Sequence, residues 1–170
     1  MTCKCGKKTA EGLKYCKKCF LRIFEKRIRR ELQRYPWFKK KEKVIILDDG
    51  TCKMGILKQQ VLPLLEDVRV QIKIGKKKIK GCRIISPENL EDVVGEFLEK
   101  VLENKKFKAD NVIRPLRQIT DKEINKYAEF KSLQYFKRKK NDILKFVDAM
   151  EKDYPETKFA LLKVSQKIQK

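Results

Sequence analysis

The stretch VIILDDGTCKM, residues 44–54, decides the fold class of this chain. It opens with four consecutive apolar residues, a pattern typical of a strand that is buried on both faces of a parallel sheet. An acidic turn follows, and residues 52–66 then carry apolar side chains at helical spacing, with Pro63 expected to distort the last turn. A strand, a tight loop and a helix N-terminus in this order form the usual anion site of nucleotide-binding α/β folds.

The rest of the chain continues the alternation of strands and helices. Further strands are predicted over residues 68–74, 82–85 and 112–113. Further helices are predicted over residues 20–35, 88–104, 120–131, 141–153 and from residue 157 onward. Ser86 and Pro87 predict the start of the helix over 88–104, and Thr120 with Glu123 forms a capping box. In the helix over 141–153 the residues expected to face inward are Ile143, Phe146, Val147 and Met150.

These elements predict an α/β fold in three parts. Residues 1–38 are expected to form a four-cysteine zinc module and a basic helix. Residues 39–119 are expected to form a reduced Rossmann-like domain with a parallel sheet, and residues 120–170 a C-terminal helical region.

The composition favours a polyanionic partner. The 170 residues include 44 Lys and Arg against 23 Asp and Glu, a formal charge of +21. Like charges at this density repel one another, and phosphates that neutralise them release counterions, so nucleic acid is the expected partner. A Lys-rich, solvated surface in a protein from a hot or salty environment is the alternative that composition leaves open.

Other protein classes are disfavoured by what the sequence lacks. The chain has no histidine, which excludes serine–histidine and cysteine–histidine catalysis and imidazole metal ligands. No apolar run approaches the ~20 residues of a membrane helix, and neither a lipidation signal nor a secretory signal is recognised. We therefore expect a cytoplasmic protein with no membrane partner.

Four cysteines near the start of the chain predict a metal site. They are Cys3, Cys5, Cys16 and Cys19. The second pair has the two-residue gap of a zinc knuckle, whereas the gap in the first pair is one residue, shorter than the usual two to four. Four thiolates can hold Zn²⁺ and leave no open coordination position, so an architectural zinc is favoured over a catalytic one. Two disulfides are the alternative, which a reducing compartment makes less favourable.

Basic residues on the first helix and in two later segments are the candidates for RNA phosphate contacts. They are Arg27, Arg29, Arg30, Arg34, Lys76, Lys77, Lys78, Lys137, Arg138, Lys139 and Lys140. The helical arginines fall largely outside the apolar stripe formed by Phe20, Phe24, Ile28, Leu32 and Tyr35. Trp37 follows this helix and could either stack on an unpaired base or anchor the core.

Cys52 and Cys82 are the remaining cysteines. One interpretation is a sulfur-carrying pair, in which Cys52 at an exposed helix N-terminus would have a lowered pKa. Two cysteines are too few for an iron–sulfur cluster held by one chain. The alternative is that both are small apolar residues of the core.

Three segments of the sequence resemble the tRNA 2-thiolation protein family of the PP-loop superfamily. The first is YCKKCFLRIFEKR at residues 15–27, after the first cysteine pair. The second is NLEDV at residues 89–93. The third comprises IRPLR at 113–117, KEI at 122–124, Tyr127 and DYPETK at 153–158. The resemblance implies a PP-loop ATPase-like sheet domain and a role in tRNA wobble-uridine thiolation.

The family's ATP-binding loop is not preserved. Catalytic members carry Ser-Gly-Gly-Lys-Asp-Ser, whereas the corresponding residues here are Asp48, Asp49, Gly50, Thr51, Cys52 and Lys53, of which only Gly50 agrees. Carboxylates repel phosphate, so ATP binding at this loop is disfavoured on physical grounds as well. The chain therefore resembles the degenerate, non-catalytic second subunit of the thiolation complex, and no catalytic residue is assigned to it.

The sequence thus favours a non-catalytic, tRNA-binding subunit that forms a heterodimer with an ATP-dependent thiolating subunit. A stand-alone sulfurtransferase using Cys52 and Cys82 is one alternative. A structural zinc protein of another RNA assembly is the other.

Overall fold

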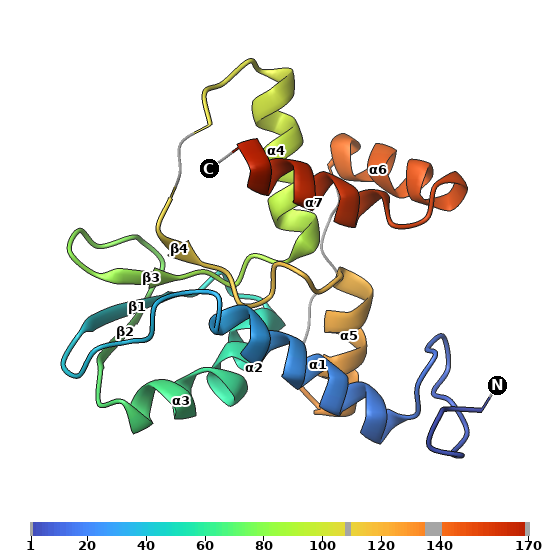
Figure 1. The fold of residues 1–170 in the computed structure, drawn as a ribbon, viewed down its shortest axis with the longest axis horizontal. Coiled ribbons are helices and arrows are strands. Elements are labelled where there is room, and N and C mark those ends of the chain that lie inside the picture. Colours follow the sequence, from blue (N-terminus) through green and yellow to red (C-terminus); the bar gives the residue numbers. More distant parts are fainter. Residues whose placement is uncertain (1, 108–109, 135–140, 169–170) are drawn as a thin grey trace.

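The computed structural model describes residues 2–107, 110–134 and 141–168, and it has the predicted α/β fold (Figure 1). Within these residues four parallel strands form one sheet with helices packed around it. In chain order the elements are α1 (Lys17–Leu32), β1 (Lys43–Leu47), α2 (Cys52–Gln60), α3 (Leu62–Asp67), β2 (Gln71–Gly75), β3 (Arg83–Ile85), α4 (Leu90–Leu102), β4 (Val112–Ile113), α5 (Asp121–Phe130), α6 (Asp142–Asp153) and α7 (Thr157–Ile168).

The order of strands in the sheet is β2-β1-β3-β4, and every pair is parallel. Ile45 of β1 lies opposite Lys73 of β2 and Ile84 of β3. The chain builds β2 on one side of β1 and β3 and β4 on the other, so the winding direction reverses between β1 and β3. In open α/β sheets this reversal, at the carboxyl ends of the strands, is where ligands bind. The loops that follow β1 and β3 both lie at this switch point.

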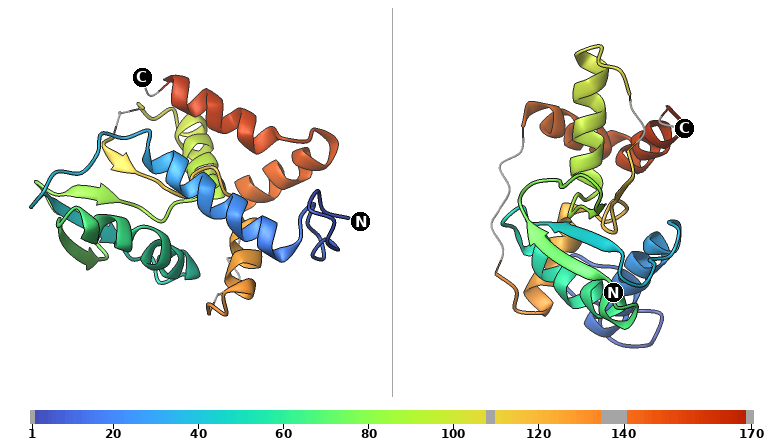
Figure 2. Two further views of the ribbon diagram at one scale, coloured as in Figure 1. Left: turned by 60° about the horizontal axis from the view of Figure 1, so that its bottom comes forward. Right: turned by 90° about the vertical axis from the view of Figure 1, so that its left-hand side faces the viewer.

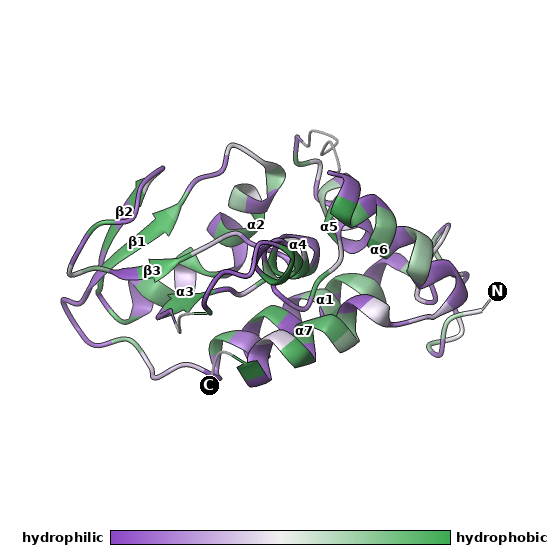
Figure 3. Ribbon diagram, turned by 90° about the horizontal axis from the view of Figure 1, so that it is seen from above, coloured by the Kyte–Doolittle hydropathy of each residue, from purple (hydrophilic) through white to green (hydrophobic). Residues whose placement is uncertain are grey.

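The apolar stripe predicted for α1 lies in the centre of the main core. Its buried members are Phe20, Phe24, Ile28 and Leu32. Phe24 stacks on Tyr127 of α5 with ring centroids 4.2 Å apart, and Val44 and Ile46 of β1 belong to the same core. Tyr35 lies beyond the end of the helix and is only half-buried. In Figure 3, β1 has the hydrophobic colour and the helices show both colours, as expected of amphipathic elements.

The helices α4, α6 and α7 pack together around a second, smaller cluster (Figure 2). Its buried members are Leu90, Val94, Val147 and Leu162. The helix α4 belongs to the predicted 39–119 unit yet packs on α6 and α7, while α5 of the predicted 120–170 region packs on α1 and α2. The domain bounds therefore stay a prediction.

The connection between β2 and β3 contains no helix. Residues 76–82 lead from the carboxyl end of β2 back to the amino end of β3, past β1. Such crossovers usually need a dozen or more residues. Here the shortened segment leaves Lys76, Lys77, Lys78 and Lys80 exposed beside the sheet.

Two predicted elements have different bounds. The helix predicted over 52–66 breaks at Val61 into α2 and α3, because Pro63 has no N–H to continue the helical ladder and instead occupies the first turn of α3. The strand predicted from residue 68 begins at Gln71, since Val68 ends α3 and Arg69 has a left-handed φ of 57°.

The start of α4 was also predicted wrongly. Its N-cap is Asn89, not Ser86. The Asn89 side chain accepts from the Asp92 N–H, and the Asp92 carboxylate accepts from the Asn89 N–H. This reciprocal capping box satisfies two backbone donors and outcompetes the Ser86-Pro87 signal. The capping box of Thr120 and Glu123 at α5 is confirmed.

Two residues predicted to face inward on α6 are exposed. Phe146 and Met150 are 64% and 37% exposed, while Leu144 and Val147 fill the core positions. The predicted face was rotated, because α6 meets α4 through Leu144, which packs against Gly95. Among the described residues, none of the helices is long and apolar enough to cross a lipid bilayer.

Candidate functional site

The four N-terminal cysteines converge on one point. The Sγ atoms of Cys3, Cys5, Cys16 and Cys19 all lie within 4.8 Å of one another. The short first gap is accommodated by a tight turn, in which the Cys3 N–H donates to the Lys7 carbonyl at 2.8 Å and Gly6 adopts a φ of 81°. That left-handed φ suits glycine, so the one-residue gap is compatible with a knuckle.

The second cysteine pair lies at the N-terminus of α1. Cys16 is the N-cap residue and Cys19 lies in the first turn, so the positive end of the helix dipole faces the thiolates. Backbone amides of Cys5 and Cys16 lower the pKa of the Cys3 thiol to about 6. The amide of Cys19 likewise lowers the pKa of Cys16, whereas hydrogen bonds with the sulfurs of Cys5 and Cys16 raise that of Cys19 to about 12. The cluster thus favours the thiolate form of Cys3 and Cys16, while Cys19 keeps its proton through hydrogen bonds to the other sulfurs.

The donor set fits a thiophilic metal ion. Zn–S bonds of about 2.3 Å in a tetrahedron separate neighbouring sulfurs by about 3.8 Å. The observed spacing, with all four sulfurs within 4.8 Å, is compatible with that arrangement. Binding of a cation would replace the hydrogen bonds between sulfurs that raise the pKa of Cys19 and would favour its thiolate form. The described residues of this site therefore form a four-cysteine metal-binding site.

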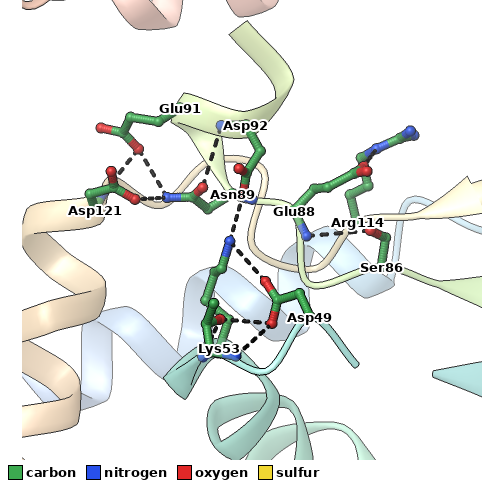
Figure 4. A network of polar contacts seen from close by, with 10 residues as sticks. Asp49, Lys53, Ser86, Glu88, Asn89, Glu91, Asp92, Arg114 and Asp121 are labelled. Atoms are coloured by element: carbon green, nitrogen blue, oxygen red, sulfur yellow. Dashed lines mark hydrogen bonds and ion pairs between the residues drawn. The ribbon is translucent and has the colours of Figure 1, made fainter. Parts of the chain in front are cut away.

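The loop after β1 is closed by its own side chains (Figure 4). The Gly50 N–H donates to the Asp48 carboxylate at 2.9 Å, and the Thr51 N–H donates to the Asp49 carboxylate at 3.0 Å. The Thr51 hydroxyl donates to Asp49 at 2.7 Å and accepts from the Lys53 N–H at 3.3 Å, which caps α2. The N–H groups of Gly50, Thr51 and Lys53, which could bind a phosphate at this helix N-terminus, thus donate to side-chain oxygens of the loop itself.

Lys53 links this loop to the start of α4 across the switch point. Its ammonium group lies 2.7 Å from the Asp92 carboxylate and 3.2 Å from that of Asp49, and only 9% of its side chain is exposed (Figure 4). Burial alone would lower the pKa of Lys53, but the carboxylates of Asp92 and Asp49 raise it above its usual value. The cation is therefore charged and already paired inside the site.

Cys52 and Cys82 lie at opposite ends of the sheet. Cys52 starts α2 at the carboxyl end of β1, and Cys82 directly precedes β3 at its amino end. A five-residue strand spans about 16 Å, whereas a disulfide needs Cα atoms within about 7 Å. Cys52 is buried in the main core, and burial raises the pKa of its thiol, contrary to the lowered pKa expected of an exposed helix N-terminus. The geometry gives no support to a redox pair.

The predicted cationic residues lie in different surroundings. Arg29, Arg30 and Arg34 are exposed toward the end of α1, although Arg34 also pairs with Glu31 at 3.4 Å. Arg27 instead joins α1 to α5, since it pairs with Glu123 and donates to the Gln118 carbonyl. Its guanidinium is engaged in the fold. The predicted contacts at Lys137, Arg138, Lys139 and Lys140 lie outside the described residues.

Several residues of these sites were not predicted. The sequence places Lys53 in a degenerate loop but does not predict its pairing, and the only local signal for its partner Asp92 is the Asn89-x-x-Asp92 capping spacing. The ion pairs of Lys158 with Glu91, Asp148 and Glu151 had no signal in the sequence pattern. They depend on how α4, α6 and α7 pack.

A comparison with solved structures finds the same fold in a tRNA-modifying enzyme. The chain is similar to the U34-tRNA thiolase NcsA from Methanococcus maripaludis with its [4Fe-4S] cluster, with a TM-score of 0.70 and 18% sequence identity. The match covers 99% of this chain and 87% of the thiolase chain. No protein-family model and no curated protein matches this sequence. The likeness shows that this chain shares the α/β fold of that thiolase, in agreement with the fold class predicted from the sequence.

Proposed function

We propose that this chain is a non-catalytic, tRNA-binding subunit of a tRNA wobble-uridine 2-thiolation complex. In this proposal it forms a heterodimer in the cytoplasm with a second subunit that binds ATP and transfers sulfur. The thiolase-like fold supports the connection to tRNA thiolation. The assignment of tRNA binding to this chain, and of ATP binding and sulfur transfer to its partner, depends on the loop after β1.

The closed loop is the observation that carries the proposal. At the place where this fold class binds nucleotides, two carboxylates accept the loop's N–H groups and Lys53 is paired with Asp49 and Asp92. A triphosphate would have to displace these contacts and approach the carboxylates of Asp48 and Asp49. We therefore expect no ATP binding by the isolated chain, and calorimetry that detects tight ATP binding would contradict the proposal.

We infer that the four-cysteine site holds zinc. The four sulfurs surround a single point, as one tetrahedral ion requires. A four-iron cluster places each thiolate on a different iron, which spreads the sulfurs farther apart. In this proposal Cys3, Cys5, Cys16 and Cys19 fix the N-terminal segment to α1, and the ion has no part in sulfur transfer.

The charge supports tRNA as the substrate that this subunit holds. Arg29 and Arg30 of α1 and Arg34 just after it are exposed, as are the lysines of residues 76–80. If six or more phosphates are neutralised, the affinity for tRNA should fall by ~10³ or more between about 50 and 200 mM salt, because the release of counterions gains less entropy when the surrounding salt is more concentrated. Fluorescence anisotropy of labelled tRNA across that range of salt concentrations measures the affinity. An affinity that does not change with salt would contradict electrostatic binding of the tRNA phosphates.

A structural zinc protein of another RNA assembly remains the alternative that the metal site and the charge also accommodate. A reconstitution experiment separates the two. The tagged chain is purified from its own cells with its bound partners, and ATP-dependent thiolation of tRNA is measured for the chain, for the partner and for both together. Activity only in the mixture supports the proposal. Activity of the partner alone that the chain does not increase contradicts it.

A further inference from the structure

A cavity opens at the amino edge of the sheet, opposite to the loop after β1. Its volume is about 650 Å³, within the range of ~300–1,000 Å³ that is usual for small-ligand sites. It lies between the segment after α1, the starts of β3 and β4, and the end of the β2–β3 connection. The residues that matter for its chemistry are Trp37, Lys39, Lys78, Arg83, Asp110 and Asn111.

Trp37 is held in an exposed position in the cavity wall. Trp37 is 53% exposed, whereas its neighbour Phe38 is buried. The Arg83 guanidinium lies over the Phe38 ring at 4.4 Å and donates to the carbonyls of Pro36 and Trp37. The Trp37 ring packs edge-on against Phe38, with centroids 6.1 Å apart. These contacts fix the backbone next to the indole. The Trp37 ring therefore presents an apolar surface to a ligand, and little conformational entropy is lost when the ligand binds.

The charges around the cavity leave two lysines outside its salt bridges. Glu42 pairs with Arg83 at 3.5 Å, and Asp110 pairs with Arg114 at 2.6 Å. In the described part of the chain Lys39 and Lys78 form no salt bridge, although Lys78 adds to the effect of Arg114 in lowering the pKa of the Asp110 carboxyl, and both lysines are exposed. The cavity therefore combines a rigid aromatic ring with two cations at its rim.

We propose that this cavity binds one unpaired base of an RNA. The base stacks on Trp37, Lys39 and Lys78 hold the phosphates on either side of it, and the Asn111 amide can donate to and accept from a base edge. Stacking on a fixed aromatic ring and flanking cations is the usual way in which proteins hold single-stranded nucleic acid. The inference rests on the proposed tRNA-binding function. It adds a contact between the protein and an unpaired base, at the amino edge of the sheet and away from the loop after β1.

The chain offers a direct test, because Trp37 is its only tryptophan. The full-length protein is titrated with tRNA and, separately, with a short unstructured oligouridylate, while tryptophan fluorescence and the anisotropy of labelled RNA are recorded. We expect saturable quenching with both RNAs. Trp37→Ala should raise the Kd for the oligonucleotide about 5- to 100-fold, and Trp37→Phe, which retains a ring, should raise it less. Lys78→Ala should weaken binding, whereas the matched change Lys163→Ala on α7, away from the cavity, should not.

The outcomes distinguish this inference from the function on which it rests. If tRNA binds without any fluorescence change and Trp37→Ala leaves both affinities unchanged, the cavity proposal is wrong and the tRNA-binding role stands. If the oligonucleotide quenches Trp37 but tRNA does not bind, the cavity binds RNA and the proposed function is wrong. If neither RNA binds, both the cavity proposal and the proposed tRNA-binding function are wrong. Circular dichroism of each variant excludes loss of folding as the cause.

Discussion

Lys53 shows how one side chain can decide what the switch point of this sheet does. An ammonium group at the start of a helix after β1 would attract a phosphate if it were free. Here it lies between Asp49 and Asp92 and is almost fully buried. The same cation that could bind a ligand instead joins α2 to the first turn of α4.

Replacing Lys53 should show how much this ion-pair network contributes to the stability of the fold. Lys53→Met leaves two partly buried carboxylates without their cation, so we expect it to lower the free energy of unfolding by about 1–3 kcal/mol. Asp92→Asn in the Lys53→Met background should recover part of that loss, because it removes one of the two negative charges that Lys53 neutralises in the unmodified protein. Urea denaturation measures both changes. Lys58→Met, on the exposed side of the same helix, is the control, and an equal loss there would contradict the assignment.

At the scale of elements, the cysteine site and α1 depend on each other. From residue 2, where the described part of the chain begins, the N-terminal segment has one isolated bridge, between Thr2 and Lys8, and few buried side chains before Cys16. Its attachment to the helix is through Cys16 at the N-cap and Cys19 in the first turn. A metal ion at the four sulfurs would therefore order the segment and the start of α1 together.

Removal of the metal should loosen this end of the molecule and leave the sheet folded. With a strong zinc chelator we expect faster amide exchange at residues 3–20 and slow exchange at β1 and β3, because the main core does not include the first cysteine pair. Cys19→Ser should show the same pattern without chelator. Hydrogen exchange with metal analysis is the measurement. An unchanged exchange pattern in metal-free protein would show that the ion has no architectural role.

At the scale of the whole molecule, a buried ion network joins the helices above the sheet. Lys158 of α7 lies 3.2 Å from Glu91 of α4 and 2.7 Å and 2.9 Å from Asp148 and Glu151 of α6. Burial and the nearby Asp121 raise the pKa of Glu91 from 4.5 to about 7, although Lys158 acts in the opposite direction. Glu91 therefore takes up a proton within the physiological range.

This pKa predicts how stability depends on pH. The folded protein holds the Glu91 proton more tightly than the unfolded chain, so the stabilisation is complete below about pH 4.5 and is lost as the pH rises through about 7. Glu91→Gln, which cannot ionise, should gain stability relative to the unmodified protein between pH 5 and pH 8, by up to about 3 kcal/mol. Denaturation of both proteins across that range tests it. Glu66→Gln on the surface of α3 is the control, and parallel pH profiles for Glu91→Gln and the unmodified protein would refute the prediction.

The sequence by itself determined the features that depend on local pattern. The apolar run of β1, the stripe of α1 and the capping box of α5 each follow from spacing along the chain. The alternation of such elements predicted the α/β fold, and the likeness to a thiolase came from the resemblance of three sequence segments to a known family. The four cysteines were identified as one metal site because ligand spacing is itself a local property.

Only the tertiary structure decided the features that join distant segments. Lys53 pairs with Asp92, which lies 39 positions away, and Arg27 pairs with Glu123, which lies 96 positions away. Trp37 and Lys78 line the same cavity from separate segments of the chain. The outward turn of Phe146 follows from the packing of α6 on α4. Charge and hydrophobicity predict which side chains can bind or bury. The packing of the helices around the sheet decides which neighbour each of these side chains contacts. The spacing of residues along the chain does not encode that choice.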